Sequence, residues 1–150
     1  MDRLRKNESK TELPANFNEL KKSINRTSNW RERLDAIEDL GQYKSRETIE
    51  LLKYRLTGDP VYKVQEAAYR KLIALGEQVT KPERKNGELI KDTKKILLRL
   101  KKSLPANHSY EDFKEKVKKV RLDLYDVYEG EKGTDFDKWL KEKWDTLLTR

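Results

Sequence analysis

The sequence predicts an all-α protein, and three observations lead to this prediction. Apolar residues recur at intervals of three and four along most of the chain, while the strict alternation typical of half-buried strands is missing. Capping residues precede many of these segments, and glycines follow several of them. With 35% hydrophobic residues, three Trp, seven Tyr and three Phe, the chain can form a packed core although 41% of it is charged.

The length and composition restrict the class of protein further. A chain of 150 residues is typical of one domain, so we expect a single all-α domain over 1–150 with a flexible polar tail at 1–12. Since it contains no Cys, disulfides and thiol sites are excluded. No apolar run approaches the length of a membrane span, and the N-terminus lacks the apolar stretch of a signal peptide. These features favour a soluble, cytoplasmic protein that does not act at membranes.

Local signals place three helices in the first part of the chain. The first spans about 15–25, where the apolar residues form one stripe. The second begins after the N-cap Asn29, with Glu32 at its third position, and the third begins after Ser45. Each of these two helices ends at a glycine. The residues expected to face inward are Phe17, Leu20, Ile24, Trp30, Leu34, Ile37, Leu40, Ile49, Leu52 and Leu56.

A fourth helix repeats the second at a constant offset of 32 residues. We expect Asp59 to be its N-cap and Pro60 its first residue, and Gly76 to follow its last residue. The matched pairs are Arg33 with Gln65, Ala36 with Ala68, and Leu40 with Leu72. A small side chain at such a position lets two layers of helices approach closely, so we expect Ala68 to be buried.

The segment 59–72 resembles a HEAT repeat, a helical hairpin whose first helix often begins after Asp-Pro and carries Val-Arg, a small Ala and then Leu. The Asp-Pro pair, the Val, the Ala and the Leu are all present, whereas Gln65 stands where the family usually has Arg. The resemblance covers about 29–76. It implies a short solenoid of HEAT-like αα-hairpins over 29–104, with the first helix and the helices of 109–150 as caps at the two ends.

Two further helices are expected after a polar loop at 77–87. One spans 88–104, and we expect it to complete the second hairpin. The other spans 110–128 and begins with a capping box formed by Ser109 and Asp112. Its inward stripe contains Phe113, Val117, Val120, Leu124 and either Val127 or Tyr128.

The chain ends in a helix with a strongly apolar face. A turn at 129–133 precedes this helix, and we expect Thr134 and Asp137 to cap it. The apolar face consists of Phe136, Trp139, Leu140, Trp144, Leu147 and Leu148.

Sequence motifs for catalysis or for cofactor binding are missing. The chain contains no G-x-G-x-x-G, no G-x-x-x-x-G-K-[ST], no H-E-x-x-H and no EF-hand loop. Its one histidine, His108, lies in a Pro-Ala-Asn-His-Ser turn, where we expect a surface histidine that is either satisfied by hydrogen bonds or solvated, and not a catalytic one. We therefore predict no catalytic residues, no metal ligands and no cofactor.

The positive charge is concentrated in one region. Of the residues in 77–108, nine are basic and four are acidic, within a chain of net charge +8. On the 88–104 helix, five lysines gather opposite the apolar face, with Arg99 at the edge and Leu98 pointing into the basic side. The lysines are Lys91, Lys94, Lys95, Lys101 and Lys102, and the next helix could extend the patch with Lys114, Lys118 and Arg121. Such a face is either an ordinary solvated surface or a site for a phosphate backbone or an acidic partner.

Three functional hypotheses follow. The first is a non-catalytic interaction module that binds a protein partner on its helical surface. The second is a module that binds the phosphate backbone of nucleic acid through the basic 77–121 region. The third, more remote, rests on a resemblance to the HEAT-like alkylpurine DNA glycosylases, which place aromatic residues and a catalytic carboxylate on a concave face. Trp30 with Asp35 would be the nearest equivalent here, but Trp30 occupies an inward position where a core tryptophan is expected.

Overall fold

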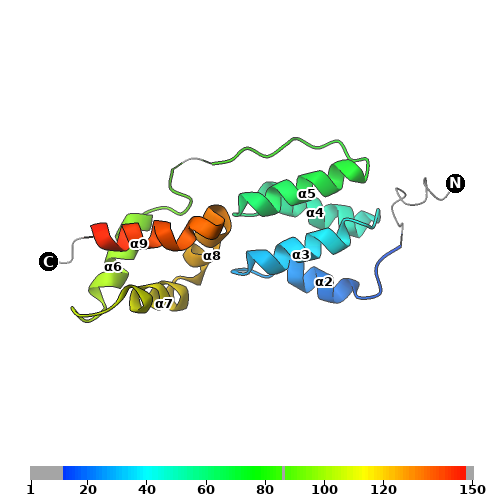
Figure 1. Ribbon diagram of the computed structural model, residues 1–150. Helices are drawn as coiled ribbons and strands as arrows, with labels where there is room; N and C mark the ends of the chain where they lie inside the picture. Colours follow the sequence, from blue (N-terminus) through cyan, green and yellow to red (C-terminus); the bar gives the residue numbers. More distant parts are fainter. Residues whose placement is uncertain (1–11, 86, 148–150) are drawn as a thin grey trace. The chain divides into compact units, whose positions relative to one another are not determined.

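The regular structure of the chain is helical, as the periodicity predicts. A computed structural model describes residues 12–85 and 87–147. Within these two ranges the structure contains helices and no β-strand (Figure 1). The predicted tail at 1–12 lies outside the described residues except for Glu12, and Leu148 lies outside them as well. Among the described residues, no helix combines the length and the apolar character that crossing a bilayer requires.

The chain divides into two compact units after Arg84, each with its own hydrophobic core. This differs from the single domain that we expect from the chain length. The reason lies in the polar segment after Gly76, which contributes only Val79 to the N-terminal core and forms no helix. A connection without apolar residues at helical spacing cannot link two cores into one.

The N-terminal unit consists of two helical hairpins. In the first, α2 (Phe17–Ile24) packs on α3 (Trp30–Leu40), and in the second, α4 (Arg46–Gly58) packs on α5 (Tyr62–Ala74). The two hairpins are joined mainly by contacts between α3 and α5, the helices related by the 32-residue offset. The first helix is therefore a member of a hairpin, whereas the sequence predicts a separate cap.

The helix starts in this unit follow the predicted capping residues. The Asn29 side chain accepts a hydrogen bond from the Glu32 backbone N–H at 3.1 Å, and Ser45 Oγ accepts one from the Thr48 N–H at 3.2 Å. Each bond satisfies a backbone donor that has no partner within the helix. Ala68 is fully buried and Ala36 is 2% exposed, which confirms that both alanines belong to the core.

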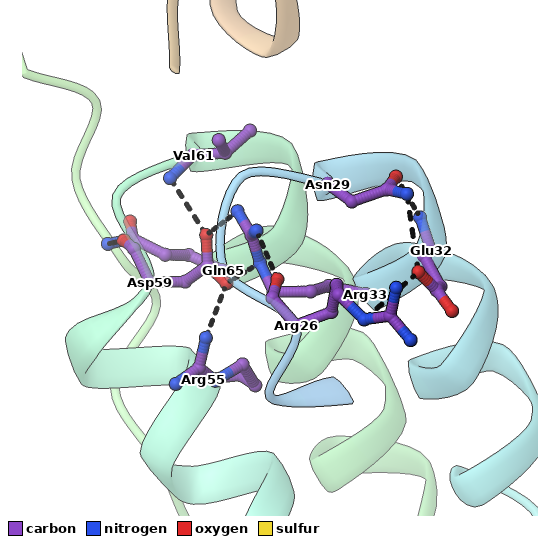
Figure 2. Close-up of polar contacts among 8 residues, drawn as sticks. All are labelled: Arg26, Asn29, Glu32, Arg33, Arg55, Asp59, Val61 and Gln65. Atoms are coloured by element: carbon purple, nitrogen blue, oxygen red, sulfur yellow. Dashed lines mark hydrogen bonds and ion pairs between the residues drawn. The ribbon is translucent and has the colours of Figure 1, made fainter. Parts of the chain in front are cut away.

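Asp59 has a different role from the one predicted. Helix α5 begins at Tyr62, so Asp59 and Pro60 precede it rather than supplying its N-cap and first turn. The carboxylate is instead buried and receives a bidentate ion pair from the Arg33 side chain at 2.8 and 3.2 Å, together with a bond from Arg55 at 3.1 Å (Figure 2). Its Oδ1 atom also accepts a hydrogen bond from the Val61 backbone N–H at 2.9 Å, so the carboxylate joins the two arginines to the residue directly before α5 (Figure 2).

The repeat pair Arg33 and Gln65 converges on the same residue. Arg33 binds the Asp59 carboxylate, while Gln65 Nε2 donates to the Asp59 backbone carbonyl at 2.7 Å (Figure 2). Arg33 also donates to the Arg26 carbonyl at 2.9 Å, which ties the loop before α3 to the same cluster. Both members of this repeat pair are thus hydrogen-bonded to Asp59.

The C-terminal unit contains α6 (Thr93–Lys102), α7 (Tyr110–Val120), α8 (Leu122–Lys132), a short 3₁₀ turn η1 (Gly133–Asp135) and α9 (Phe136–Thr146). Helix α6 packs on α7 and α9, and α8 packs on both α7 and α9. The predicted 88–104 helix, shortened to α6, therefore belongs to this bundle and does not complete the second hairpin.

The predicted 110–128 helix is interrupted at Arg121, whose φ of −129° and ψ of 66° are not helical. The prediction of Val120 as a core residue is wrong, because its side chain is 50% exposed. The break allows Val117 of α7 and Leu124 of α8 to enter one core from two helices of different direction. The capping box of Ser109 and Asp112 at the start of α7 is confirmed.

The predicted turn at 129–133 and the predicted cap of the last helix are also wrong. Helix α8 continues to Lys132 with Gly130 buried inside it, and the chain turns at Gly133, where φ is +58°. Thr134 lies in η1, and α9 begins after Asp135. The predicted apolar face of α9 is largely inward, with Phe136, Leu140 and Leu147 buried and Trp139 and Trp144 half-buried.

Candidate functional site

The candidate site is one side of α6, whose sequence contains basic but no acidic residues. Thr93, Leu97 and Leu100 are buried and hold the helix on the C-terminal core. The opposite side carries exposed cations, which we call the α6 basic face. Its members are Lys91, just before the helix, and Lys94, Lys95, Arg99 and Lys102.

Among the described residues, the cations of the α6 basic face have no acidic partner. Across residues 12–85 and 87–147, no hydrogen bond or ion pair involves the side chain of any of these five residues. Leu98 lies between them on the helix, half-buried and packed partly against the C-terminal core. The arrangement is a half-buried apolar side chain surrounded by cations that remain free to bind an external anion.

Lys101 does not belong to the α6 basic face, although the sequence predicts that it does. Its Nζ donates to the backbone carbonyls of Trp144 and Leu147 at 2.5 and 2.8 Å and lies 5.5 Å from the centre of the Trp144 ring. These carbonyls are at the C-terminal end of α9, where a cation is stabilised by the helix dipole. Lys101 is therefore a capping residue of α9.

The predicted extension onto the next helices is largely neutralised. Lys114 pairs with Asp137 at 2.7 Å, and Arg121 makes a bidentate contact with Asp123 at 3.0 and 2.9 Å. Lys118 is exposed, with its Nζ 5.6 Å from the centre of the Tyr125 ring. Lys114 and Arg121 thus stabilise their own unit.

These ion pairs shift pKa values in the directions that keep both partners charged. The hydrogen bond to Asp137 raises the pKa of Lys114, and the one to Asp123 raises the pKa of Arg121. The pKa of Asp123 is lowered, chiefly by its hydrogen bond from Arg121. At neutral pH Lys114, Arg121 and Asp123 therefore remain ionised.

Tyr110 completes a small polar cluster with Asp137 and Lys114. Its hydroxyl donates to Asp137 Oδ1 at 2.9 Å, and its pKa is raised, first by burial and then by the bond to Asp137. The pKa of Asp137 is lowered by the hydrogen bonds from Lys114 and Tyr110. General acid–base catalysis needs a group that titrates near the working pH, and these shifts move each group away from it.

His108 is a satisfied surface histidine, as predicted. Its Nε2 accepts a hydrogen bond from Trp144 Nε1 at 2.8 Å, and its Nδ1 lies 2.6 Å from the Pro105 carbonyl. With Nε2 accepting, the ring proton is on Nδ1 and bonds that carbonyl. Both nitrogens thus have partners within the protein. In the part of the chain that the structure describes, no group of His, Asp and Glu side chains could hold a metal ion.

Trp30 and Asp35, the pair considered for a glycosylase-like site, do not share an environment. Trp30 is 7% exposed and belongs to the N-terminal core, which confirms the prediction of a core tryptophan. Asp35 is exposed. The Trp30 ring is therefore covered by protein and does not form an open aromatic surface beside a carboxylate.

Lys132 on α8 and Lys143 on α9 were not predicted as site residues, yet both line a pocket that Lys94 also lines. No local signal in the sequence could identify them, because their proximity depends on how α8 and α9 pack on α6.

The chain was compared with known protein families, curated proteins and solved structures, and none of them matches it.

Proposed function

We propose that this chain is a non-catalytic helical interaction module, built in part from HEAT-like hairpins, which binds an acidic surface of a protein partner through the α6 basic face. The observation that carries the proposal is a set of five exposed cations around the half-buried Leu98, none of which has an acidic partner in the described part of the chain. Elsewhere in the C-terminal unit, Lys114 and Arg121 are already paired with acids.

The N-terminal unit supports the HEAT-like part of the proposal. Its two hairpins stack through α3 and α5, which the 32-residue repeat relates, and Ala36 and Ala68 are buried in its core. Stacked hairpins give a rigid support with long exposed helical surfaces, which repeat proteins use to bind other proteins.

The composition of the α6 basic face favours a protein surface over nucleic acid. It contains no aromatic residue on which a base could stack, and Arg99 is its single side chain capable of forked recognition. An apolar centre with a charged rim is the usual organisation of a protein–protein interface, and Leu98 supplies that centre. An acidic protein surface with an apolar contact point would match it.

The phosphate backbone of nucleic acid is the second candidate partner. The net charge of +8 favours association with any polyanion, and lysines bind phosphates as point charges. Such binding would be independent of base sequence. With at most five phosphates contacted, the affinity for duplex DNA should fall with salt at a logarithmic slope no steeper than about −4.5.

The test compares three forms of the full chain: the parent, a variant with Lys94, Lys95 and Lys102 replaced by Glu, and a control with Lys119, Lys138 and Lys141 replaced by Glu. The control changes the net charge equally on exposed lysines of the same unit. Each form is used to capture proteins from extract of the source cell, with and without nuclease treatment. We expect the same proteins with the parent and the control and their loss with the first variant.

Binding to a fluorescent 20-base-pair duplex is measured in parallel at several salt concentrations. Capture that disappears on nuclease treatment, together with the steep salt slope, would transfer the function to nucleic acid. Equal capture by all three forms would remove the α6 basic face from the interaction.

A further inference from the structure

The C-terminal unit contains a pocket that the proposed function does not use. It encloses about 400 Å³ and is lined by residues of α6, α8 and α9 together with the segment just before α6. This volume lies in the range of small-molecule sites, which are commonly formed between the helices of bundles.

One side of the pocket is apolar and aromatic. Leu97 and Leu147 are buried there, and the Tyr128 and Trp139 rings stack at a centroid distance of 4.3 Å and an interplanar angle of 16°. Trp139 is half-buried, and together with the leucines it forms the apolar and aromatic side of the pocket against which a ligand ring can pack.

Hydrogen bonds hold the aromatic wall in place. The Thr93 hydroxyl donates to the Ile90 carbonyl and therefore accepts from the Tyr128 hydroxyl, which lies 2.9 Å away. The Tyr128 oxygen in turn accepts from the Leu89 backbone N–H at 3.0 Å. Because the phenol is fixed at both its hydrogen and its oxygen, the stacked rings are held in position before any ligand binds.

Three lysines from three helices line the same pocket: Lys94 of α6, Lys132 of α8 and Lys143 of α9. Glu88 is the one acidic residue of the lining. Throughout the described ranges, no ion pair or hydrogen bond involves the side chains of these lysines, although the Lys132 ammonium lies 5.6 Å from the centre of the Trp139 ring. The lining thus has an excess of positive charge next to an apolar wall.

From this combination we infer that the pocket binds a small organic anion that carries an aromatic ring. The ring packs against Trp139 and the neighbouring leucines, and the phosphate, sulfonate or carboxylate binds the lysine ammonium groups. Neither half of the pocket alone selects such a ligand, because the wall would accept any apolar ring and the lysines any anion. The inference stands apart from the proposed function, with which it shares only Lys94.

The test uses isothermal titration calorimetry with four probes on the full chain. AMP and 2-naphthoate each combine a ring with an anion, whereas adenosine provides a ring alone and inorganic phosphate an anion alone. We expect at least one ring-bearing anion to bind at least tenfold more tightly than adenosine and phosphate do. Binding of AMP but not of 2-naphthoate would assign the anion as a phosphate, and the reverse would assign it as a carboxylate.

Variants locate the binding. Lys132→Gln and Lys143→Gln should each weaken the preferred probe about fivefold, and Trp139→Leu at least tenfold, while Lys138→Gln on α9, outside the pocket lining, should have no effect. Since Trp139→Leu could unfold the unit, its helicity and melting temperature are compared with those of the parent, and the two lysine variants test the site independently.

Failure of the ring-bearing anions to exceed phosphate alone, or affinities unchanged in Lys132→Gln and Lys143→Gln, would overturn the inference. Lys143→Gln leaves the α6 basic face intact, so it should retain the protein capture described above. The inference about the pocket and the proposed function can therefore fail separately.

Discussion

In the N-terminal unit the Arg33–Asp59 ion pair is buried, whereas in the C-terminal unit the Lys114–Asp137 and Arg121–Asp123 ion pairs lie at the surface. The Arg33 and Asp59 side chains are 2% and 0% exposed, while Lys114 and Asp137 are 25% and 62% exposed. A buried pair is costly to form but more costly to break, so it restricts which surfaces can pack together. A surface pair contributes little to stability and leaves its neighbours open to solvent and partners.

The cores differ in the same sense. The N-terminal core is mainly aliphatic, with closely packed alanines, whereas the C-terminal core and its edge contain most of the aromatic side chains. In the proposed function, the N-terminal unit is the support and the C-terminal unit carries the binding surface, and this difference between the two cores is consistent with that proposal.

The largest expected effect comes from replacing Asp59 by Ala. This change leaves Arg33 and Arg55 without their shared buried carboxylate, and breaking such a pair typically costs about 3–5 kcal/mol. We expect urea unfolding to show this loss in the free energy of unfolding. Glu66→Ala removes a carboxylate from an ion pair with the largely exposed Arg70 and should cost less than about 1 kcal/mol. Equal effects of the two changes would contradict the contrast between buried and exposed pairs.

Ala68→Leu should destabilise the protein next most strongly. Ala68 is fully buried in α5, and adding three carbon atoms to a packed core typically costs about 1–3 kcal/mol. Ala74→Leu provides the control, because Ala74 is exposed on the same helix. Thermal melts should show a lower melting temperature for Ala68→Leu alone. A lower melting temperature for both variants would mean that close packing is not specific to this position.

Ser109→Ala should have a smaller effect, about 1 kcal/mol, because it removes the capping box at the start of α7. Ser103→Ala is a suitable comparison, since Ser103 follows α6 and its hydroxyl bonds only the Leu100 carbonyl. Urea unfolding monitored by circular dichroism should distinguish the two. Indistinguishable midpoints would show that the cap does not limit the stability of the C-terminal unit.

The smallest effect is expected for the pH dependence of Asp137. Its folded-state pKa is lowered by the bonds from Lys114 and Tyr110, so its contribution to stability is present above the unfolded value of about 3.9 and is lost as the pH falls through the folded pKa. Because this side chain is largely exposed, Asp137→Asn should cost at most about 1 kcal/mol at pH 7. The difference from the parent should narrow at pH 2.5. A stability difference between parent and variant that is larger at pH 2.5 than at pH 7 would contradict the lowered pKa of Asp137.

Signals within a few residues of one another predicted the local structure well. The caps at Asn29, Ser45 and Ser109 are correct because each involves a side chain and a backbone N–H three residues away. The burial of Ala68 and Trp30 follows from helical periodicity alone. The same periodicity placed Lys94, Lys95 and Lys102 on the exposed side of α6.

The partners of several side chains and the boundaries of some elements depended on residues that are distant in the sequence. Asp59 could cap a helix or pair with Arg33, and Lys101 could face solvent or bind the end of α9; the sequence does not show which partner comes within reach. The break at Arg121 and the division after Arg84 likewise depend on which core each apolar residue can enter. The sequence by itself therefore determined the helices, their caps and the excess of cations. Only the tertiary structure decided that Lys101 and Lys114 have partners while the cations of the α6 basic face have none among the described residues, because those partners lie far away along the chain.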